Sequence, residues 1–401
     1  MENYQSDVTD RLLAEIAVKV QLSPTNYDLA VERYGTIAKF LDENSQLFDS
    51  IEGIFPQGSM AIGATISTPY RTDEEFDIDL VAKLPKNSDW KNHTPAEILD
   101  CFHKAFLSSD RYKRVVERNT RCVTLKYKNM HLDITPLVDR DNLQHGNVMH
   151  HRHEDREDDP TGKQVPSSPQ LFAEWFEGCM PEELAFESYY RDLTFDAVEA
   201  VLTEKSAEIE EVPEQEKAQF KPRAKIALQL IKRFRNIQYA TRKGRMPPSI
   251  LLSKLVADEA PHGNSTKSLT EELIRITAAL EKKLKQGKIK EFNPEDHLDE
   301  LTDRWPETED QQKMFANDLS EFHSKLSTLR TANMSDKRKT LKELFGENVG
   351  SAAVESVSDA LAKNVKSGTN KILSGTSGTI LVDSQKAAGT VTPKPKDFFG
   401  S

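Results

Sequence analysis

The stretch PQGSMAIGATISTPYRTDEEFDIDLV, residues 56–81, holds the two features from which the fold and the chemistry are predicted. Asp77 and Asp79 stand two residues apart in a run that alternates acidic with apolar side chains. Successive side chains of a strand point to opposite faces, so both carboxylates are predicted on one face and their apolar neighbours in a core. Upstream, Gly58–Ser59 directly follows an apolar run, which is typical of a turn out of a strand.

A third acid is predicted beside this pair. In MHLDITPLV, residues 130–138, Asp133 also alternates with apolar residues. If the two strands are neighbours, three mutually repelling carboxylates converge, and Mg²⁺ prefers such oxygens together with substrate phosphates. The pattern predicts two Mg²⁺ ions and phosphoryl transfer, with Asp77, Asp79 and Asp133 as catalytic residues and metal ligands. A D-x-D pair alone is also typical of a solvated strand edge.

The turn before these acids predicts a phosphate site. Gln57, Gly58 and Ser59 follow the strand that ends at Phe55, and a Gly–Ser turn leaves backbone N–H groups and a hydroxyl free to approach a phosphate. The stretch lacks the Walker pattern. An ordinary turn closed by Gly58 is the alternative, but a Gly–Ser turn, a D-x-D pair and a later Asp form a more specific combination.

Composition limits the partners. A net charge of −11 disfavours stable binding of DNA or long RNA, which depends on phosphate neutralisation by Lys and Arg. No apolar run approaches the ~18 residues of a membrane span, and the acidic N-terminus is unlike a signal peptide. Three widely spaced cysteines, Cys101, Cys122 and Cys179, argue against a disulfide framework or a zinc cluster. We expect a cytoplasmic protein.

Periodicity predicts an α+β fold. Apolar residues at helical spacing indicate helices over 8–21 and 26–44, the second long and amphipathic. Short runs between 51 and 138 indicate strands of a small mixed sheet, with a helix at 95–109, and the polar residues 140–170 indicate a loop. Further helices are predicted at 170–177, 181–210, 216–241, 248–258, 267–288, 307–330 and 335–345.

Two lobes and a tail follow from this pattern. A core lobe with the N-terminal helices is predicted over residues 1–165 and a helical lobe over 166–348, joined by the long N-terminal helix. Residues 349–401 are rich in Ser, Thr, Gly, Ala and Lys without a periodic apolar face, which indicates a flexible C-terminal tail.

The motifs resemble a known family. Gly–Ser, D-x-D and a separate Asp resemble the signature of the polymerase-beta-like nucleotidyltransferases. The surrounding sequence, with Gly-Ala-Thr-Ile after Gly–Ser and an acidic run before DIDL, resembles the bacterial CD-NTases, relatives of cyclic GMP-AMP synthase and oligoadenylate synthase. LQLIKRFRNIQ (228–238), PPSILLSKL (247–255) and FNPEDHLDELTDRW (292–305) resemble segments of that family's helical lobe. The resemblance extends over residues 25–330.

That resemblance implies an activity. It implies a polymerase-beta-like lobe and a helical lobe that together join ATP, with a second nucleoside triphosphate such as GTP, into a cyclic di- or trinucleotide for anti-phage defence in a CBASS system. Two alternatives stay open. One is a nucleotidyltransferase that adds single nucleotides to RNA, protein or a small molecule, and the other is a catalytically silent nucleotide-binding protein.

The resemblance also implies binding residues. Gly58 and Ser59 would hold the triphosphate, and Lys232 in LIKRFR and Ser249 in PPSI would contact phosphates from the helical lobe. Lys232 is one of several basic residues in its helix, so a solvated basic face is the alternative. The animal DNA sensor's zinc insertion has no counterpart here, so activation by double-stranded DNA is not implied.

The C-terminus has two interpretations. It is a spacer, or, as some members of the family imply, a substrate for a ubiquitin-activating or conjugating-like partner that acts on the tail ending Gly400–Ser401. The family also implies regulatory proteins as partners.

Overall fold

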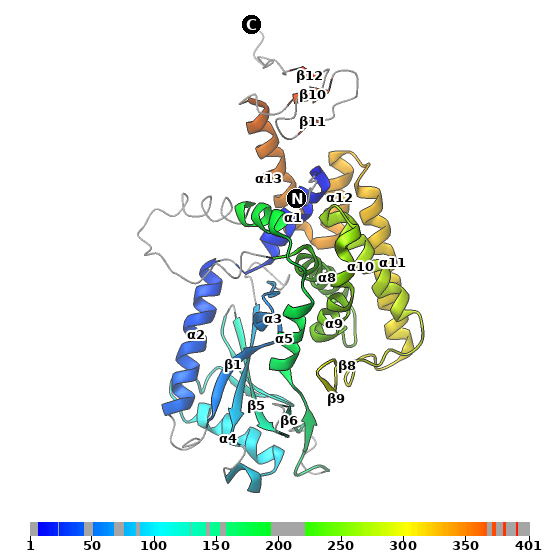
Figure 1. Cartoon of the computed structure of the whole chain (residues 1–401). Coiled ribbons are helices and arrows are strands. Elements are labelled where there is room, and N and C mark those ends of the chain that lie inside the picture. The colour runs from blue at the N-terminus through cyan, green and yellow to red at the C-terminus, as the bar shows by residue number, and fades with distance from the viewer. Residues whose placement is uncertain are drawn as a thin grey trace.

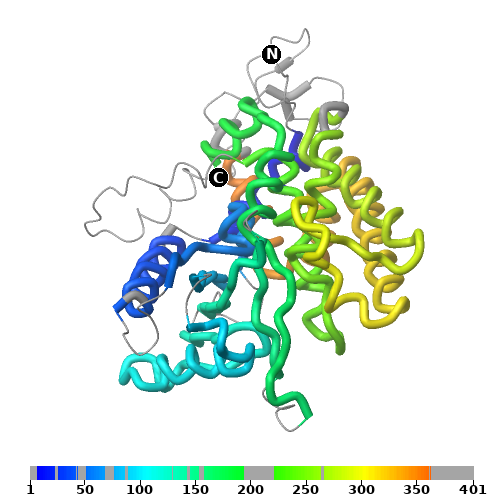
Figure 2. The backbone as a smooth tube through the Cα atoms, turned by 60° about the horizontal axis from the view of Figure 1, so that its bottom comes forward, coloured from blue at the N-terminus to red at the C-terminus, as the bar shows by residue number. Residues whose placement is uncertain are grey.

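The structure is a computed structural model with two lobes side by side (Figure 1). A sheet lobe contains residues of the first half of the chain, and a helical lobe most of the second half (Figure 1). In the tube of Figure 2, the stretch from 158 to 193 runs between them. The structure describes residues 7–22, 24–43, 51–67, 76–85, 89–128, 130–141, 145–152, 158–193, 221–366, 371–373, 380–381 and 390–391.

One mixed sheet forms the first lobe, in the order β1-β2-β5-β4-β3, with β6 paired to β5 and β7 to β6. The central pair β2 and β5 is parallel, and the remaining pairs are antiparallel. The predicted mixed sheet is therefore confirmed. The strands are β1 (Gly53–Gln57), β2 (Phe76–Leu84), β3 (Val116–Arg118), β4 (Val123–Lys126), β5 (Met130–Asp139), β6 (Gly146–His150) and β7 (Lys163–Pro166).

Strands β6 and β7 correct the predicted loop over 140–170. β4 pairs with the first half of β5, and β6 pairs with its last part, Leu137–Asp139, along the same edge. Both strands are short, and β7 reads Lys-Gln-Val-Pro, so neither shows the alternation that identifies a strand in the sequence. Their hydrogen-bond partners, rather than their own periodicity, determine them.

Two helices cover one face of this sheet. The α2 helix (Pro24–Glu43), predicted as a long amphipathic helix, packs there through Ala30, Ile37 and Leu41, and the α4 helix (Pro95–Leu107) packs beside it. A capping box between Thr94 and Glu97 fixes the start of α4. Alternate residues of β2 and β5 complete this core, so the acidic residues between them lie on the other face of the sheet. The buried residues are Phe76, Ile78, Leu80, Leu132 and Ile134.

The helical lobe has a continuous apolar core of its own, and its predicted helices are confirmed where the chain is described. The helix predicted over 181–210 is present at 184–193, and its remainder lies outside the described residues. The elements are α5 (Pro169–Cys179), α8 (Arg223–Tyr239), α9 (Ser249–Glu259), η3 (Ala260–Ser265), α10 (Leu269–Leu284), β8 (Phe292–Asn293), β9 (Asp296–Glu300), α11 (Glu309–Leu329) and α12 (Met334–Phe345).

The two ends of the chain correct the predicted lobe limits. The α1 helix (Val8–Val20) packs in the core of the helical lobe rather than in the sheet lobe, against α8, α10 and α13. Since α2 packs on the sheet, the N-terminal helices join the lobes by lying one in each. The α13 helix (Glu347–Lys366) occupies the first part of the predicted tail, because Ala353, Val354 and Val357 form an apolar stripe that is buried against α1.

Beyond α13, three short strands are described, β10 (Lys371–Leu373), β11 (Ile380–Leu381) and β12 (Thr390–Val391). They pair antiparallel in the order β11-β10-β12. The rest of the predicted tail, including Gly400–Ser401, lies outside the described residues. Within the described part of the chain, none of the helices combines the length and hydropathy needed to span a bilayer.

Candidate active site

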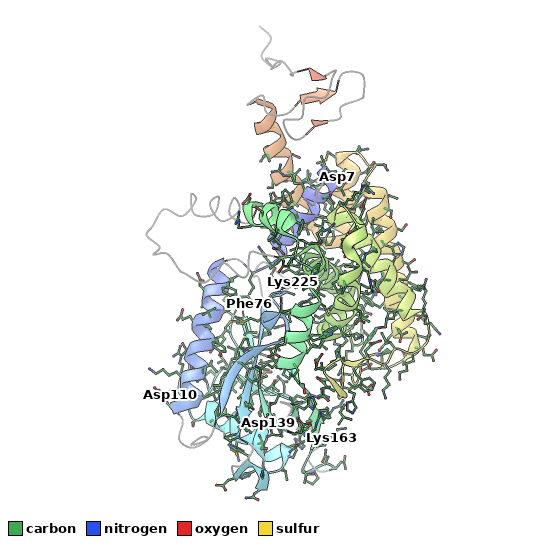
Figure 3. The ribbon with its side chains drawn as sticks, in the orientation of Figure 1. Asp7, Phe76, Asp110, Asp139, Lys163 and Lys225 are labelled. Carbon is green, nitrogen blue, oxygen red and sulfur yellow. The ribbon has the colours of Figure 1, made fainter. Side chains whose placement is uncertain are left out.

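The three predicted acids lie together on neighbouring strands. Asp79 of β2 is the register partner of Asp133 of β5, and Asp77 is the partner of His131. All three aspartates line one cavity of about 430 Å³ to which both lobes contribute residues. Asp77 and Asp79 follow Phe76 at the start of β2, and Asp139 is the last residue of β5, at the opposite end of this parallel pair (Figure 3).

The electrostatics of Asp79 reflect this crowding. Burial, helped by the neighbouring Asp133 and Asp77 and opposed by Lys232, raises the pKa of Asp79 to about 7. Asp77 is exposed, and its carboxylate lies 3.4 Å from Nδ1 of His131. A cation beside these oxygens would favour the ionised forms, because it offsets both desolvation and mutual repulsion.

Asp133 is held by a chain of hydrogen bonds that starts in the β3–β4 hairpin. Its Oδ1 accepts a hydrogen bond from Oγ1 of Thr124, its register partner on β4. Thr124 Oγ1 in turn accepts one from Nδ2 of Asn119 at 2.6 Å. These two positioning residues could not be predicted from the sequence, since only the pairing of β4 with β5 brings them to Asp133.

The Gly58 turn fits closely against Asp79. Gly58 has a φ of +61°, and a Cβ at this position would overlap the Asp79 carboxylate. The preceding Gln57 is the register partner of Asp79, and its Nε2 donates to Oγ1 of Thr135 at 3.1 Å. Gln57, Gly58 and Ser59 all line the cavity, Ser59 from the short α3 helix (Gly58–Ala61). Their predicted contact with phosphate remains a prediction.

Two buried cations line the cavity on the side of the helical lobe. Lys232 is 3 % exposed, and its Nζ donates to Ala64 O at 2.8 Å. Arg235, also 3 % exposed, donates through Nη1 to Pro247 O at 2.8 Å and to Ser249 Oγ at 3.1 Å. Among the described residues neither forms an ion pair, and burial lowers the pKa of Lys232 to about 7 and that of Arg235 to about 10.

The helical lobe contributes two of the predicted residues to the cavity and one that was not predicted. Lys232 and Ser249 line the cavity, and their contact with phosphates remains a prediction; Lys232 is buried and so is not part of a solvated basic face. Arg235 was missed, although its spacing of three residues from Lys232 places both on one face of α8. A buried cation without a carboxylate is costly, so an anionic ligand in the cavity would offset the desolvation of both.

The cavity suits a metal-assisted transfer of a phosphorylated group. Among the described residues, no group of three or more His, Cys, Asp or Glu is already arranged around a metal position. The donor chemistry nevertheless fits Mg²⁺, because three carboxylates on one wall supply hard oxygen ligands and the raised pKa of Asp79 marks a site where a cation is favoured. With acids on the sheet lobe and cations on the helical lobe, the fold and the cavity define a two-lobe nucleotidyltransferase.

Known proteins are similar to this chain in sequence and in fold. Residues 8–157 match the model of the Second Messenger Oligonucleotide or Dinucleotide Synthetase domain. The chain is 34% identical over 368 residues, 90% of its length and 86% of the relative's, to the cyclic dinucleotide synthase CdnG of Bradyrhizobium diazoefficiens. It is 26% identical over 404 residues, 99% of its length and 98% of the relative's, to a c-di-GMP synthase of Roseivirga ehrenbergii.

A solved structure is also similar to this protein in fold. The structure of the Bradyrhizobium diazoefficiens CD-NTase CdnG in complex with GTP superposes with a TM-score of 0.74 at 33% identity, covering 88% of this chain and 99% of that one. The chain therefore belongs to the bacterial CD-NTase family of CBASS type. It is a cyclic oligonucleotide synthase, so the alternatives of single-nucleotide transfer and of a silent binding protein are set aside.

Proposed function

We propose that this enzyme uses GTP as at least one substrate and releases pyrophosphate as it forms a cyclic dinucleotide in the cytoplasm. The observation that carries the proposal is the cavity of about 430 Å³ with aspartates on one side and, on the other, buried cations that form no ion pair with any described residue. Guanosine is favoured because one relative is described in complex with GTP and another is named a c-di-GMP synthase. The second nucleotide is ATP or GTP.

The cations and the Gly58 turn would bind the triphosphate. Lys232 and Arg235 provide charge from the helical lobe, and Ser249, which accepts a hydrogen bond from Arg235, is held at the cavity wall. Gly58 and Ser59 provide a close backbone approach and a hydroxyl from the sheet lobe. Charge-assisted hydrogen bonds to phosphate oxygens are stronger than neutral ones, so these groups would fix the triphosphate against the acids.

Asp77, Asp79 and Asp133 would hold two Mg²⁺ ions. When bound, such ions activate an attacking hydroxyl and offset the charge of the triphosphate and of the leaving pyrophosphate. Thr124 and Asn119 keep the Asp133 carboxylate oriented toward the cavity through their hydrogen bonds. Burial and the neighbouring acids raise the pKa of Asp79 to about 7, so a cation bound beside it would favour its ionised form.

Incubation with nucleotides tests the proposal directly. Purified enzyme is incubated with each labelled triphosphate, ATP, GTP, CTP and UTP, alone and in pairs with Mg²⁺, and the products are treated with phosphatase and separated by chromatography. We expect a phosphatase-resistant product that contains guanosine label and whose mass is that of a cyclic dinucleotide. A resistant product without guanosine would refute the choice of substrate, and a linear product would refute cyclisation.

We also propose that partner proteins act on the C-terminal segment. The α13 helix projects from the helical lobe away from the sheet lobe (Figure 1), so a partner that binds beyond Lys366 would not obstruct the cavity. A ubiquitin-activating-like partner would join the C-terminus to another molecule. Deleting residues 397–401 should then abolish conjugation in a reaction with that partner while leaving nucleotide synthesis intact; unchanged conjugation would refute it.

A further inference from the structure

A segment rich in acids, residues 296–303, closes one side of the cavity. Asp299, Glu300 and Asp303 line the cavity, and Asp296 is buried and does not line it. Three of these four acids are neutralised by a basic side chain. The ion pairs are Arg140–Asp296 (2.6 Å), Lys290–Glu300 (3.5 Å) and Arg121–Asp303.

Asp299 is the exception. It is 8 % exposed and has no cationic partner among the described residues. Its Oδ2 accepts hydrogen bonds from Ser168 N at 2.9 Å and from Asn293 Nδ2 at 3.0 Å. Its Oδ1 accepts none from the described residues. A largely buried carboxylate that lines the cavity and has one oxygen without a donor among the described residues is suited to accept N–H donors from a ligand, because each would stabilise its charge.

The remaining donors would come from a ligand in the cavity. Burial and the neighbouring Asp296 and Asp303 raise the pKa of Asp299, whereas the hydrogen bonds from Ser168 and Asn293 lower it. Additional N–H donors at Oδ1 would therefore stabilise the ionised form in the same way.

Apolar side chains line the same cavity as this carboxylate. The hydrogen bond to Ser168 places Asp299 at the start of α5, which contributes Phe172 to the cavity wall, and Leu301 lines the cavity two residues further along the chain. Phe172 and Leu301 are 3 % and 6 % exposed. An apolar wall with one acceptor at its edge suits a flat heterocycle that carries N–H donors on one edge.

Among the four bases, guanine matches this site best. Its N1–H and 2-amino group are adjacent donors, which one carboxylate can accept together. Adenine instead presents one amino donor beside the N1 lone pair, and a carboxylate repels that lone pair. We propose that Asp299 selects guanine, by accepting hydrogen bonds from N1–H and the 2-amino group of one substrate base that packs against Phe172 and Leu301. This inference rests on the proposed use of GTP.

Dissociation constants test the assignment. Non-hydrolysable α,β-methylene analogues of GTP, of inosine triphosphate, which lacks the 2-amino group, and of ATP are titrated with Mg²⁺ into the wild type, Asp299→Asn and Asp296→Asn. Asp296→Asn is the matched control, because Asp296 belongs to the same buried network, bonding Ser168 Oγ at 2.7 Å, but does not line the cavity. Thermal melting shows that each variant is folded.

The wild type should bind the GTP analogue about tenfold or more tightly than the inosine analogue, since one charge-assisted hydrogen bond is lost. Asp299→Asn should lose this preference and also the preference over ATP, while Asp296→Asn keeps both ratios. Equal loss of these preferences in Asp299→Asn and Asp296→Asn would mean that Asp299 has a purely structural role, and would overturn the proposal. If Asp299→Asn does not fold, the wild-type ratio of GTP to inosine triphosphate decides, and equal binding overturns it. Failure of the wild type to bind any guanosine analogue would instead refute the proposed substrate.

Discussion

Gly58 and Asp79 are in such close contact that no side chain fits between them. A Cβ on Gly58 would overlap the Asp79 carboxylate, and the φ of +61° is unfavourable for an L-residue with a side chain. The turn that is expected to bind phosphate is thus packed directly on an acid that is expected to bind metal. The two halves of the predicted site are therefore mechanically coupled.

Replacement of Gly58 tests this coupling. In Gly58→Ala, the turn and the Asp79 side chain must both shift, and a displacement of ~1 Å at reacting groups costs about 10²-fold in rate. We expect at least that loss of cyclic product, measured by chromatography, with a destabilisation of about 1 kcal/mol from the positive φ. Gly53→Ala, at the other end of β1 with open space around its Cβ, is the control and should keep full activity. Equal activity of both variants would contradict the coupling.

Asp77→Asn tests the metal assignment. An amide of equal size cannot hold the cations, so product formation should fall to background while the fold is kept, because one of three repelling charges is removed. Chromatography of the product and thermal melting measure the two effects. Asp110→Asn is a distant control, since Asp110 is exposed and pairs only with Lys113 among the described residues. Synthesis retained by Asp77→Asn would refute the role of this carboxylate.

The sequence predicted the acids because strands have a period of two, which is visible in EFDIDLV and MHLDITPLV. It did not predict Thr124, Asn119 or Asp299, because their roles depend on which strands and lobes meet. The β6 and β7 strands were missed for the same reason: their pairing with the sheet outweighs a sequence without alternation.

The C-terminal helix α13 shows a second limit of prediction from the sequence. A tail rich in Ser, Ala and Lys indicated flexibility, yet Ala353, Val354 and Val357 are buried against α1. A short apolar stripe forms a stable helix only when another element covers it. Here that element is α1, which is distant in the sequence: Ala14 of α1 and Val354 of α13 are 340 positions apart.

Lys232→Met tests whether the buried lysine serves the ligand rather than the fold. Lys232 has no carboxylate partner among the described residues and its pKa is lowered, so an apolar side chain of similar length should leave the melting temperature unchanged or raise it. Nucleotide binding should weaken about tenfold or more, because a charge-assisted hydrogen bond is lost. Calorimetric titration with a non-hydrolysable triphosphate measures this effect.

Lys254→Met is the matched control for that experiment. Lys254 pairs with Asp258 at 2.6 Å and with Glu291 at 2.7 Å and does not line the cavity. Its removal leaves Asp258 and Glu291 with Lys283 as their one remaining basic partner among the described residues, so the melting temperature should fall while nucleotide affinity is kept. A lower melting temperature with unchanged nucleotide affinity in Lys232→Met, together with weakened affinity and an unchanged melting temperature in Lys254→Met, would show that Lys232 is a structural residue.

His150 predicts how stability depends on pH. Burial and the nearby cations Arg121, Lys163 and Arg304 lower the pKa of His150 to about 4, and its Nδ1 accepts a hydrogen bond from Nε of Arg121 at 3.0 Å. The unfolded chain therefore binds more protons than the folded one between pH 6.5 and about 4. The stabilisation from neutral His150 is complete above pH 6.5 and is lost as the pH falls toward 4. Asn can accept the same hydrogen bond without titrating, so His150→Asn should lose less melting temperature than the wild type between pH 7.5 and pH 5. Arg121, the hydrogen-bond donor to His150, also pairs with Asp303 of the helical lobe. Identical dependence of melting temperature on pH in His150→Asn and the wild type would contradict the prediction, because protonation of His150 would then disturb neither contact of Arg121.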